Sequence, residues 1–202
     1  MKMISDLLIR FRNTEEGSIS IELLLVVPIL VWALMSTLVY FDIFRAEAIS
    51  NRASLTIADM VSREEDPINY DYIDAVHELL QVLAEADNDP DIRVTYFAYD
   101  HDGESKVHSM IWSETAGGYS DGHDDASLQA LSDQLPVMAS NDRAFLVETR
   151  MKYRAPFEVG IGPFVTTNLD GHEFTNFTVI RPRFANVCFD YEDGNPPQCD
   201  PD

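Results

Sequence analysis

The chain has 202 residues and a formal net charge of −21, from 35 acidic against 14 basic residues. A protein this acidic is repelled by phosphate backbones, which argues against nucleic-acid binding. The content of 46% hydrophobic and 10% aromatic residues excludes a chain that is disordered throughout.

An apolar run near the N-terminus sets the predicted topology. The stretch Leu23–Phe41 contains no charged residue, and this length suits an α-helix that crosses a bilayer. Residues 1–17 carry three cationic side chains, which favour the cytoplasmic side. We therefore expect a cytoplasmic leader at 1–17, a transmembrane helix at 18–44 and a body on the far side of the membrane.

Two residues within the apolar helix stand out. Glu22 lies just inside its N-terminal end, and a carboxylate in lipid is costly unless a partner neutralises it, which makes Glu22 a functional candidate. Pro28 removes one backbone hydrogen bond and is expected to kink or loosen the helix.

Helical periodicity continues beyond the apolar run. Residues 45–66 place apolar side chains at spacings of three and four, which predicts an amphipathic extension that keeps the helix going to about Ser62. The Ala46-Glu47-Ala48 pattern leaves another possibility open, in which a signal peptidase cuts here and releases a secreted domain.

The body, residues 67–187, has the pattern of an α+β domain with an antiparallel sheet. A hairpin is predicted around Asp102-Gly103, and the strand from Ala144 to Tyr153 alternates between a mainly apolar and a mainly charged face. The expected elements are a helix at 70–86, strands at 92–99 and 105–113, a mobile polar loop at 114–126, a short helix after it capped by Asp125 or Ser127, and strands at 144–153 and 173–180.

Two cysteines, Cys188 and Cys199, lie in a C-terminal tail at 188–202. In an exported body they are expected to form a disulfide that closes a short loop, whereas in the cytosol they would be free thiols.

Possible catalytic and metal-binding patterns are incomplete. His77-Glu78 begins a zinc-protease pattern, but Gln81 stands where the second histidine belongs. The acidic turn from Asp100 has its glycine too early for a calcium loop, and residues 121–125 offer at most a loose cation site around His123. We expect no enzyme activity and no cofactor, and whether the acidic loops bind calcium stays open.

The opening segment Gly17-Ser-Ile-Ser-Ile-Glu22-Leu-Leu-Leu-Val-Val-Pro28 resembles the N-terminus of TadE/TadG-like pseudopilins of the tight-adherence (Flp pilus) system. The shared features are a small residue, a four-residue spacer, Glu, an aliphatic run and a Pro. The resemblance implies the lollipop plan of a pilin, with a long N-terminal membrane helix and a small periplasmic domain.

The same resemblance implies a role in assembling Flp-type pili for adherence or secretion. A prepilin peptidase would cut between Gly17 and Ser18, and Glu22 would set the register between subunits by pairing with the new amine of a neighbouring Ser18. The implied partners are that peptidase, other pilin or pseudopilin subunits and the pilus assembly machinery, at the bacterial inner membrane.

Two departures from the family pattern keep an alternative open. Leu23 stands where an aromatic residue often follows the Glu, and the leader carries Glu15-Glu16 where basic residues are usual. An uncleaved, TadG-like protein with a single membrane span would instead act as a periplasmic scaffold or binding module.

Overall fold

In the computed structural model of the protein, the chain forms two compact units. The first comprises the chain up to Asp42 together with residues 156–168, and the second comprises residues 43–155 and 169–202. The structure describes residues 18–85, 89–102, 105–157, 159–161, 165–167, 169–184 and 187–199.

One helix, α2 (Ser18–Val61), contributes its beginning to the first unit and its end to the second. It continues through the position of Pro28, and its bounds confirm the helix predicted from about Ser18 to about Ser62. Carbonyl groups of its last turn accept hydrogen bonds from the N–H groups of residues 62–64, and Pro67 limits any extension of the helix to less than two further turns.

Helix α3 (Tyr70–Leu83) is the second predicted helix and is confirmed. The side chain of Asn69 caps it by accepting a hydrogen bond from the Tyr72 N–H at 3.0 Å. The predicted end at residue 86 is wrong by one turn. The helix stops at Leu83 because Glu85 adopts a left-handed conformation, with φ of 50°.

The second unit is built on a four-stranded antiparallel sheet in the order β2-β1-β3-β6. Its strands confirm the predicted hairpin and the two later strands, although residues 103–104 of the hairpin turn lie outside the described residues. The first unit contains a two-stranded sheet of β4 (Val159–Ile161) and β5 (Val165–Thr167), which the sequence did not predict. The four long strands are β1 (Asp91–Asp102), β2 (Ser105–Ala116), β3 (Asp142–Lys152) and β6 (Glu173–Ile180).

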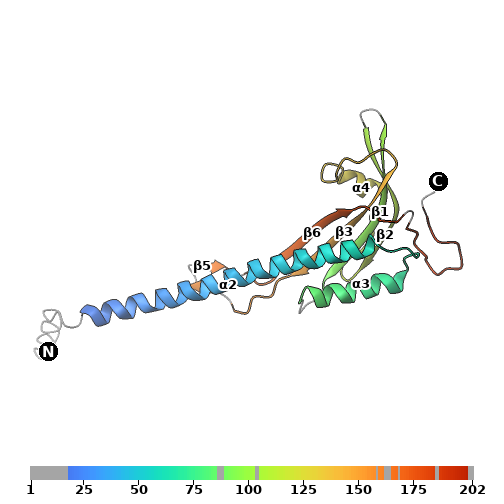
Figure 1. The fold of residues 1–202 in the computed structure, drawn as a ribbon. Coiled ribbons are helices and arrows are strands. Elements are labelled where there is room, and N and C mark those ends of the chain that lie inside the picture. Colours follow the sequence, from blue (N-terminus) through green and yellow to red (C-terminus); the bar gives the residue numbers. More distant parts are fainter. Residues whose placement is uncertain are drawn as a thin grey trace, which may run out of the picture. The chain divides into compact units, whose positions relative to one another are not determined.

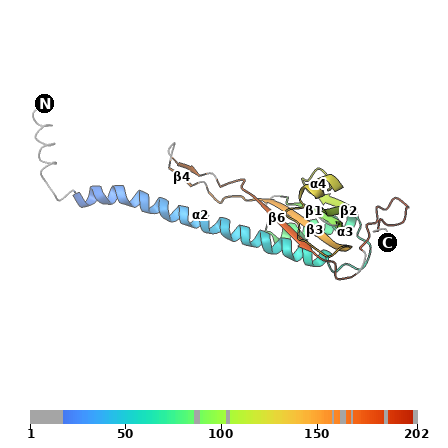
Figure 2. The same cartoon turned by 90° about the horizontal axis from the view of Figure 1, so that it is seen from above.

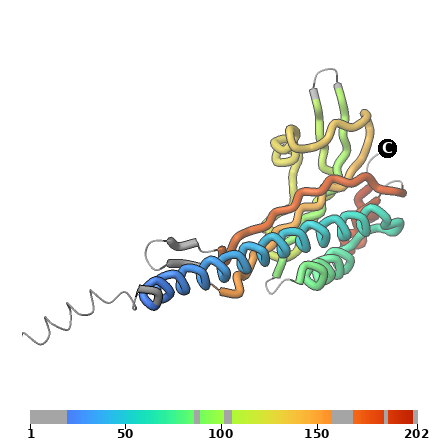
Figure 3. Tube along the Cα trace, turned by 60° about the vertical axis from the view of Figure 1, so that its left-hand side comes forward, coloured from blue at the N-terminus to red at the C-terminus, as the bar shows by residue number. Residues whose placement is uncertain are grey.

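Helices cover both faces of the four-stranded sheet. The C-terminal part of α2 and helix α3 lie side by side on one face (Figures 1 and 3), and the ion pair of Arg45 with Glu85 joins them. The short helix α4 (Asp125–Ala130) lies on the opposite face (Figure 2). A large apolar cluster fills the α2/α3 face, and a smaller cluster around Leu128 and Leu146 fills the α4 face.

Strand β3 differs from its predicted pattern. We expected one mainly apolar and one mainly charged face, but β3 is a central strand and both of its faces are covered. Phe145 and Val147 pack into the larger cluster, while Leu146 packs under α4. Glu148, on the predicted charged face, is only 7% exposed.

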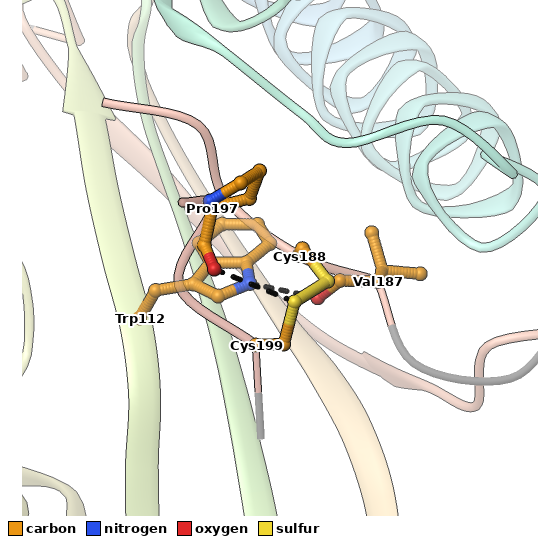
Figure 4. Close-up of a disulfide and its surroundings, with 5 residues drawn as sticks. All are labelled: Trp112, Val187, Cys188, Pro197 and Cys199. Atoms are coloured by element: carbon orange, nitrogen blue, oxygen red, sulfur yellow. Dashed lines mark hydrogen bonds between the residues drawn. A yellow bond between two sulfur atoms is a disulfide. The ribbon is translucent and has the colours of Figure 1, made fainter. Parts of the chain in front are cut away.

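The C-terminal segment is part of the core. Val187 and Phe189 are buried in the larger cluster, and Phe189 exchanges backbone hydrogen bonds of 2.9 and 2.7 Å with Gln198. The predicted disulfide between Cys188 and Cys199 is present and closes this loop. Beside it lies Trp112, whose Nε1–H donates to the Val187 carbonyl at 3.1 Å (Figure 4). The disulfide therefore holds a loop that covers the aromatic centre of the fold.

The structure predicts that this disulfide contributes measurably to stability. Replacing both cysteines by serine frees a short closed loop in the unfolded chain, so we expect the free energy of unfolding to fall by about 3 kcal/mol. Denaturant unfolding of both proteins measures the difference. Chemical reduction of the wild type is the control and should give the same loss. Equal stability of the oxidised and reduced forms would contradict the assigned role.

Candidate functional site: the apolar half of helix α2

The first half of α2 carries large apolar side chains with no cover. They lie on most of the circumference of the helix and are 42–76% exposed. Within the described residues α2 is the one helix long and apolar enough to cross a membrane. The exposed set is Ile21, Leu23, Leu24, Leu25, Val26, Val27, Ile29, Leu30, Val31, Leu34, Met35, Leu38, Tyr40, Phe41 and Phe44.

An apolar surface of this extent indicates a non-aqueous or protein environment. Soluble monomers rarely leave contiguous apolar patches of more than a few hundred Å² in water. Burial is favourable by about 25 cal/mol per Å², so lipid or other helices stabilise this segment where water does not. Its backbone is compatible with both, because a helix satisfies its polar groups internally.

Glu22 is exposed in the second turn of this segment. Ser18 is the first residue of α2 and lies one turn before Glu22, so the two positions share a helix face. Gly17, the residue before the predicted cleavage site, lies outside the described residues. Pro28 lies inside the helix, one and a half turns beyond Glu22.

One stripe of the apolar half is covered. Trp32 and Ser36 are half-buried and Val39 is 1% exposed, at helical spacings of four and three. Trp32 Nε1 and Ser36 Oγ have no hydrogen-bond partner among the described residues. This stripe separates the apolar half into an open surface and a packed surface.

Further along α2, in the second unit, a buried serine attaches the helix to the sheet. Ser50 is fully buried and accepts a hydrogen bond of 2.8 Å from Asn176 Nδ2 on β6. The same amide lies 3.2 Å from Thr149 Oγ1 on β3. Ile57 and Val61 of the same helix are fully buried in the larger apolar cluster. The second half of α2 is thus an integral helix of the body.

A buried polar cluster lies on the α4 face of the sheet. Arg93 holds Glu148 with two hydrogen bonds, Nε to Oε2 at 2.7 Å and Nη2 to Oε1 at 2.9 Å. His123 Nε2 lies 2.8 Å from the same Glu148 Oε2. Next to them Arg150 pairs with Asp91 at 2.6 Å, and the Tyr119 ring lies between the two guanidinium groups, 4.6 and 4.8 Å from their central carbons. These contacts fix the loop we expected to be mobile.

The charge state of this cluster follows from its surroundings. Burial alone would raise the pKa of Glu148, but the hydrogen bonds from His123 and Arg93 outweigh it and hold this pKa below its ordinary value. Burial also raises the pKa of the Tyr119 phenol. Glu148 therefore stays ionised as the shared acceptor of the cluster.

Ser127, His123 and Glu148 stand in the order of a hydrolytic triad, yet their bonds point to a structural role. Ser127 Oγ lies 3.0 Å from His123 Nδ1, but it also donates to the Asp124 carbonyl and accepts from the Asp124 N–H, both at 3.0 Å. This capping box starts α4, and its N-cap is Asp124, not the predicted Asp125 or Ser127. The serine hydroxyl is committed to the helix cap.

The residues of the incomplete metal-binding patterns make other contacts. His77 Nε2 lies 2.6 Å from the Pro90 carbonyl, and Asp100 accepts hydrogen bonds from the His101 N–H and the Ser140 hydroxyl. Asp125 accepts the Met110 N–H at 2.7 Å. Among the described residues no three His, Cys, Asp or Glu side chains gather closely enough to hold a metal ion.

No family model, curated protein or solved structure matches the chain.

The polar cluster predicts a specific pH dependence. Folding lowers the pKa of Glu148 from its ordinary value of 4.5, so the ionised group adds stability above that value. This contribution is lost as the pH falls through the lower pKa of the folded state. We expect Glu148→Gln to reduce the free energy of unfolding at neutral pH by about 3 kcal/mol and to flatten its dependence on acid.

Chemical unfolding of both proteins from neutral to acidic pH measures this effect. The control is Glu173→Gln, which removes an exposed carboxylate 3.7 Å from Lys152 and should cost at most about 1 kcal/mol. Parallel pH profiles for the wild type and Glu148→Gln would show that Glu148 does not carry the acid dependence.

Proposed function

We propose that this protein is a pilus-assembly subunit anchored in the bacterial inner membrane by one span. The observation that carries the proposal is the contrast along α2, which exposes apolar side chains in its first half and is buried in the body in its second. A membrane span suits the first half, and packing into an extramembrane body suits the second.

The proposed orientation places the N-terminus in the cytoplasm and the body in the periplasm. The cationic side chains of the leader favour this direction. The Cys188–Cys199 disulfide also favours it, since disulfides persist in the periplasm and are rare in the cytosol.

The proposed mechanism is that of a TadE-like pseudopilin. Prepilin peptidase cleavage between Gly17 and Ser18 removes the residues before α2, so the mature chain begins at the first helical residue. The new α-amine lies one turn from Glu22, and in an assembly it pairs with Glu22 of a neighbouring subunit. That pair neutralises both charges in apolar surroundings and fixes the axial register. In this proposal the protein itself has no enzymatic role.

A second candidate function is an uncleaved, TadG-like membrane scaffold. It is favoured by Leu23 after Glu22 and by Glu15-Glu16 in the leader, both departures from the usual processed form. In this case the apolar half of α2 only anchors the body.

The mature N-terminus separates these functions. Mass spectrometry of the protein from cells with the prepilin peptidase should find Ser18 as the first residue, and from cells without it an intact leader. An intact leader in both strains would support the uncleaved scaffold. A chain that begins at Ile49 would show cleavage by signal peptidase and a secreted domain.

Glu22 tests assembly apart from anchoring. We expect Glu22→Ala to reduce incorporation into pili or their base at least about tenfold, because the partner amine then lacks its counter-charge in an apolar environment. Membrane insertion should persist, since the substitution makes the span more apolar. The measurement compares subunit in purified assemblies with subunit in membranes. The matched control is Glu47→Ala on the same helix, and normal incorporation of Glu22→Ala would contradict the register role.

A further inference from the structure

A surface pocket in the second unit is unusually rich in arginine. It has a volume of about 270 Å³ and is lined by residues 141–143 where β3 begins, by residues 181–184 after β6, and by Tyr96 of β1. Three lining residues are arginines, Arg143, Arg181 and Arg183, and one is a carboxylate, Asp142. We call this surface the arginine pocket.

Around the arginine pocket there are fewer carboxylates than guanidinium groups. Arg181 pairs with Asp142, while Arg183 and Arg63 both reach Asp59 at 2.8 Å. Elsewhere Arg45 and Lys152 each pair with one carboxylate of their own. Because Arg63 and Arg183 share the single carboxylate of Asp59, one guanidinium is in excess at the edge of the arginine pocket, on a protein whose net charge is −21.

The geometry of the pocket suits an anion presented on a protein surface. Arg181 and Arg183 are 59% and 53% exposed, and a guanidinium has five N–H donors, so each retains donors beyond its ion pair. The Arg183 N–H donates to the Ser62 carbonyl at 2.7 Å, which fixes the pocket to the end of α2. Phe184, 45% exposed, adds an apolar rim. Guanidinium groups favour carboxylates and phosphates through paired hydrogen bonds.

A matching acidic surface exists on α3 of the same sequence. Asp71, Asp74 and Glu78 are exposed and share one helix face through spacings of three and four. None of the three forms an ion pair with another described residue. The pocket is lined from β1, β3 and the segment after β6, so the α3 face of the same chain is not part of it.

We propose that the arginine pocket binds the acidic α3 face of a second copy of this chain. The two surfaces are different, so the contact is head-to-tail and can repeat along a fibre. This inference rests on the proposed assembly function and names the contact between bodies. Lipid phosphates of the anchoring membrane are a poorer match, because Ile43 to Asp59 already spans about 24 Å of helix.

A charge-swap experiment on the full-length chain tests the contact. One variant carries Arg181→Glu and Arg183→Glu, and the other carries Asp71→Lys, Asp74→Lys and Glu78→Lys. In detergent micelles, sedimentation measures the dissociation constant of self-association. We expect each variant alone to associate about tenfold more weakly than the wild type, and an equal mixture of the two to recover most of the loss.

The controls separate this contact from general charge effects and from unfolding. Arg52→Glu makes the same kind of charge change on an exposed part of α2 outside the pocket and should leave association unchanged. Arg181→Gln with Arg183→Gln repeats the test without charge reversal, in case the reversed variant does not fold.

Three results would overturn the proposal: a wild type that stays monomeric, pocket variants that associate normally, or a mixture that recovers nothing. Pocket-dependent binding to anionic vesicles without self-association would also overturn it, in favour of a lipid ligand. The N-terminus of each variant is sequenced in the same preparations. If the chain begins at Ser18 but the pocket substitutions leave association unchanged, only the proposed contact between bodies is rejected. If the pocket substitutions weaken association of a chain that keeps its leader, only the proposed peptidase cleavage is rejected.

Discussion

The structure depends on one helix that needs two different surroundings. The first half of α2 exposes apolar side chains on most of its circumference, whereas Ile57 and Val61 in the second half are fully buried under the sheet. Because the backbone hydrogen bonds in the interior of a helix are made within the helix, the same element is stable in lipid, between helices or in a protein core. The change of surroundings therefore requires only a change of side chains along one continuous backbone.

The core of the body is centred on a few aromatic residues. Trp112 contacts Phe145 and Phe189, with ring centroids 5.8 and 5.2 Å apart, and joins the sheet to the C-terminal loop. The disulfide limits the conformations that loop has in the unfolded chain. Residues near the C-terminus thus pack in the same core as residues of α2.

The elements with a clear local period were predictable from the sequence. The helix from Ser18, helix α3 and the β1–β2 hairpin follow their apolar spacing and turn residues. The burial of both faces of β3 was not predictable, because it depends on which strands pair with it and on α4 covering its second face. The buried polar cluster around Glu148 was not predicted either, because it too depends on which strands pair and on what covers the sheet. The sequence holds one signal of this cluster. Arg93 and Glu148 have opposite charges, and each lies inside a predicted strand.

Glu148 and Glu22 show how the same side chain indicates two different roles. Glu148 is buried, and its charge is balanced inside the chain by Arg93 and His123, so it contributes to folding. Glu22 is exposed on an apolar helix and has no ion-pair partner among the described residues. In water this carboxylate needs no ion-pair partner, but in lipid an unpaired charge is costly. If the first half of α2 enters a membrane, a cationic group of a neighbouring molecule is one means of balancing Glu22, and in the proposed assembly that group is the Ser18 amine of a second subunit.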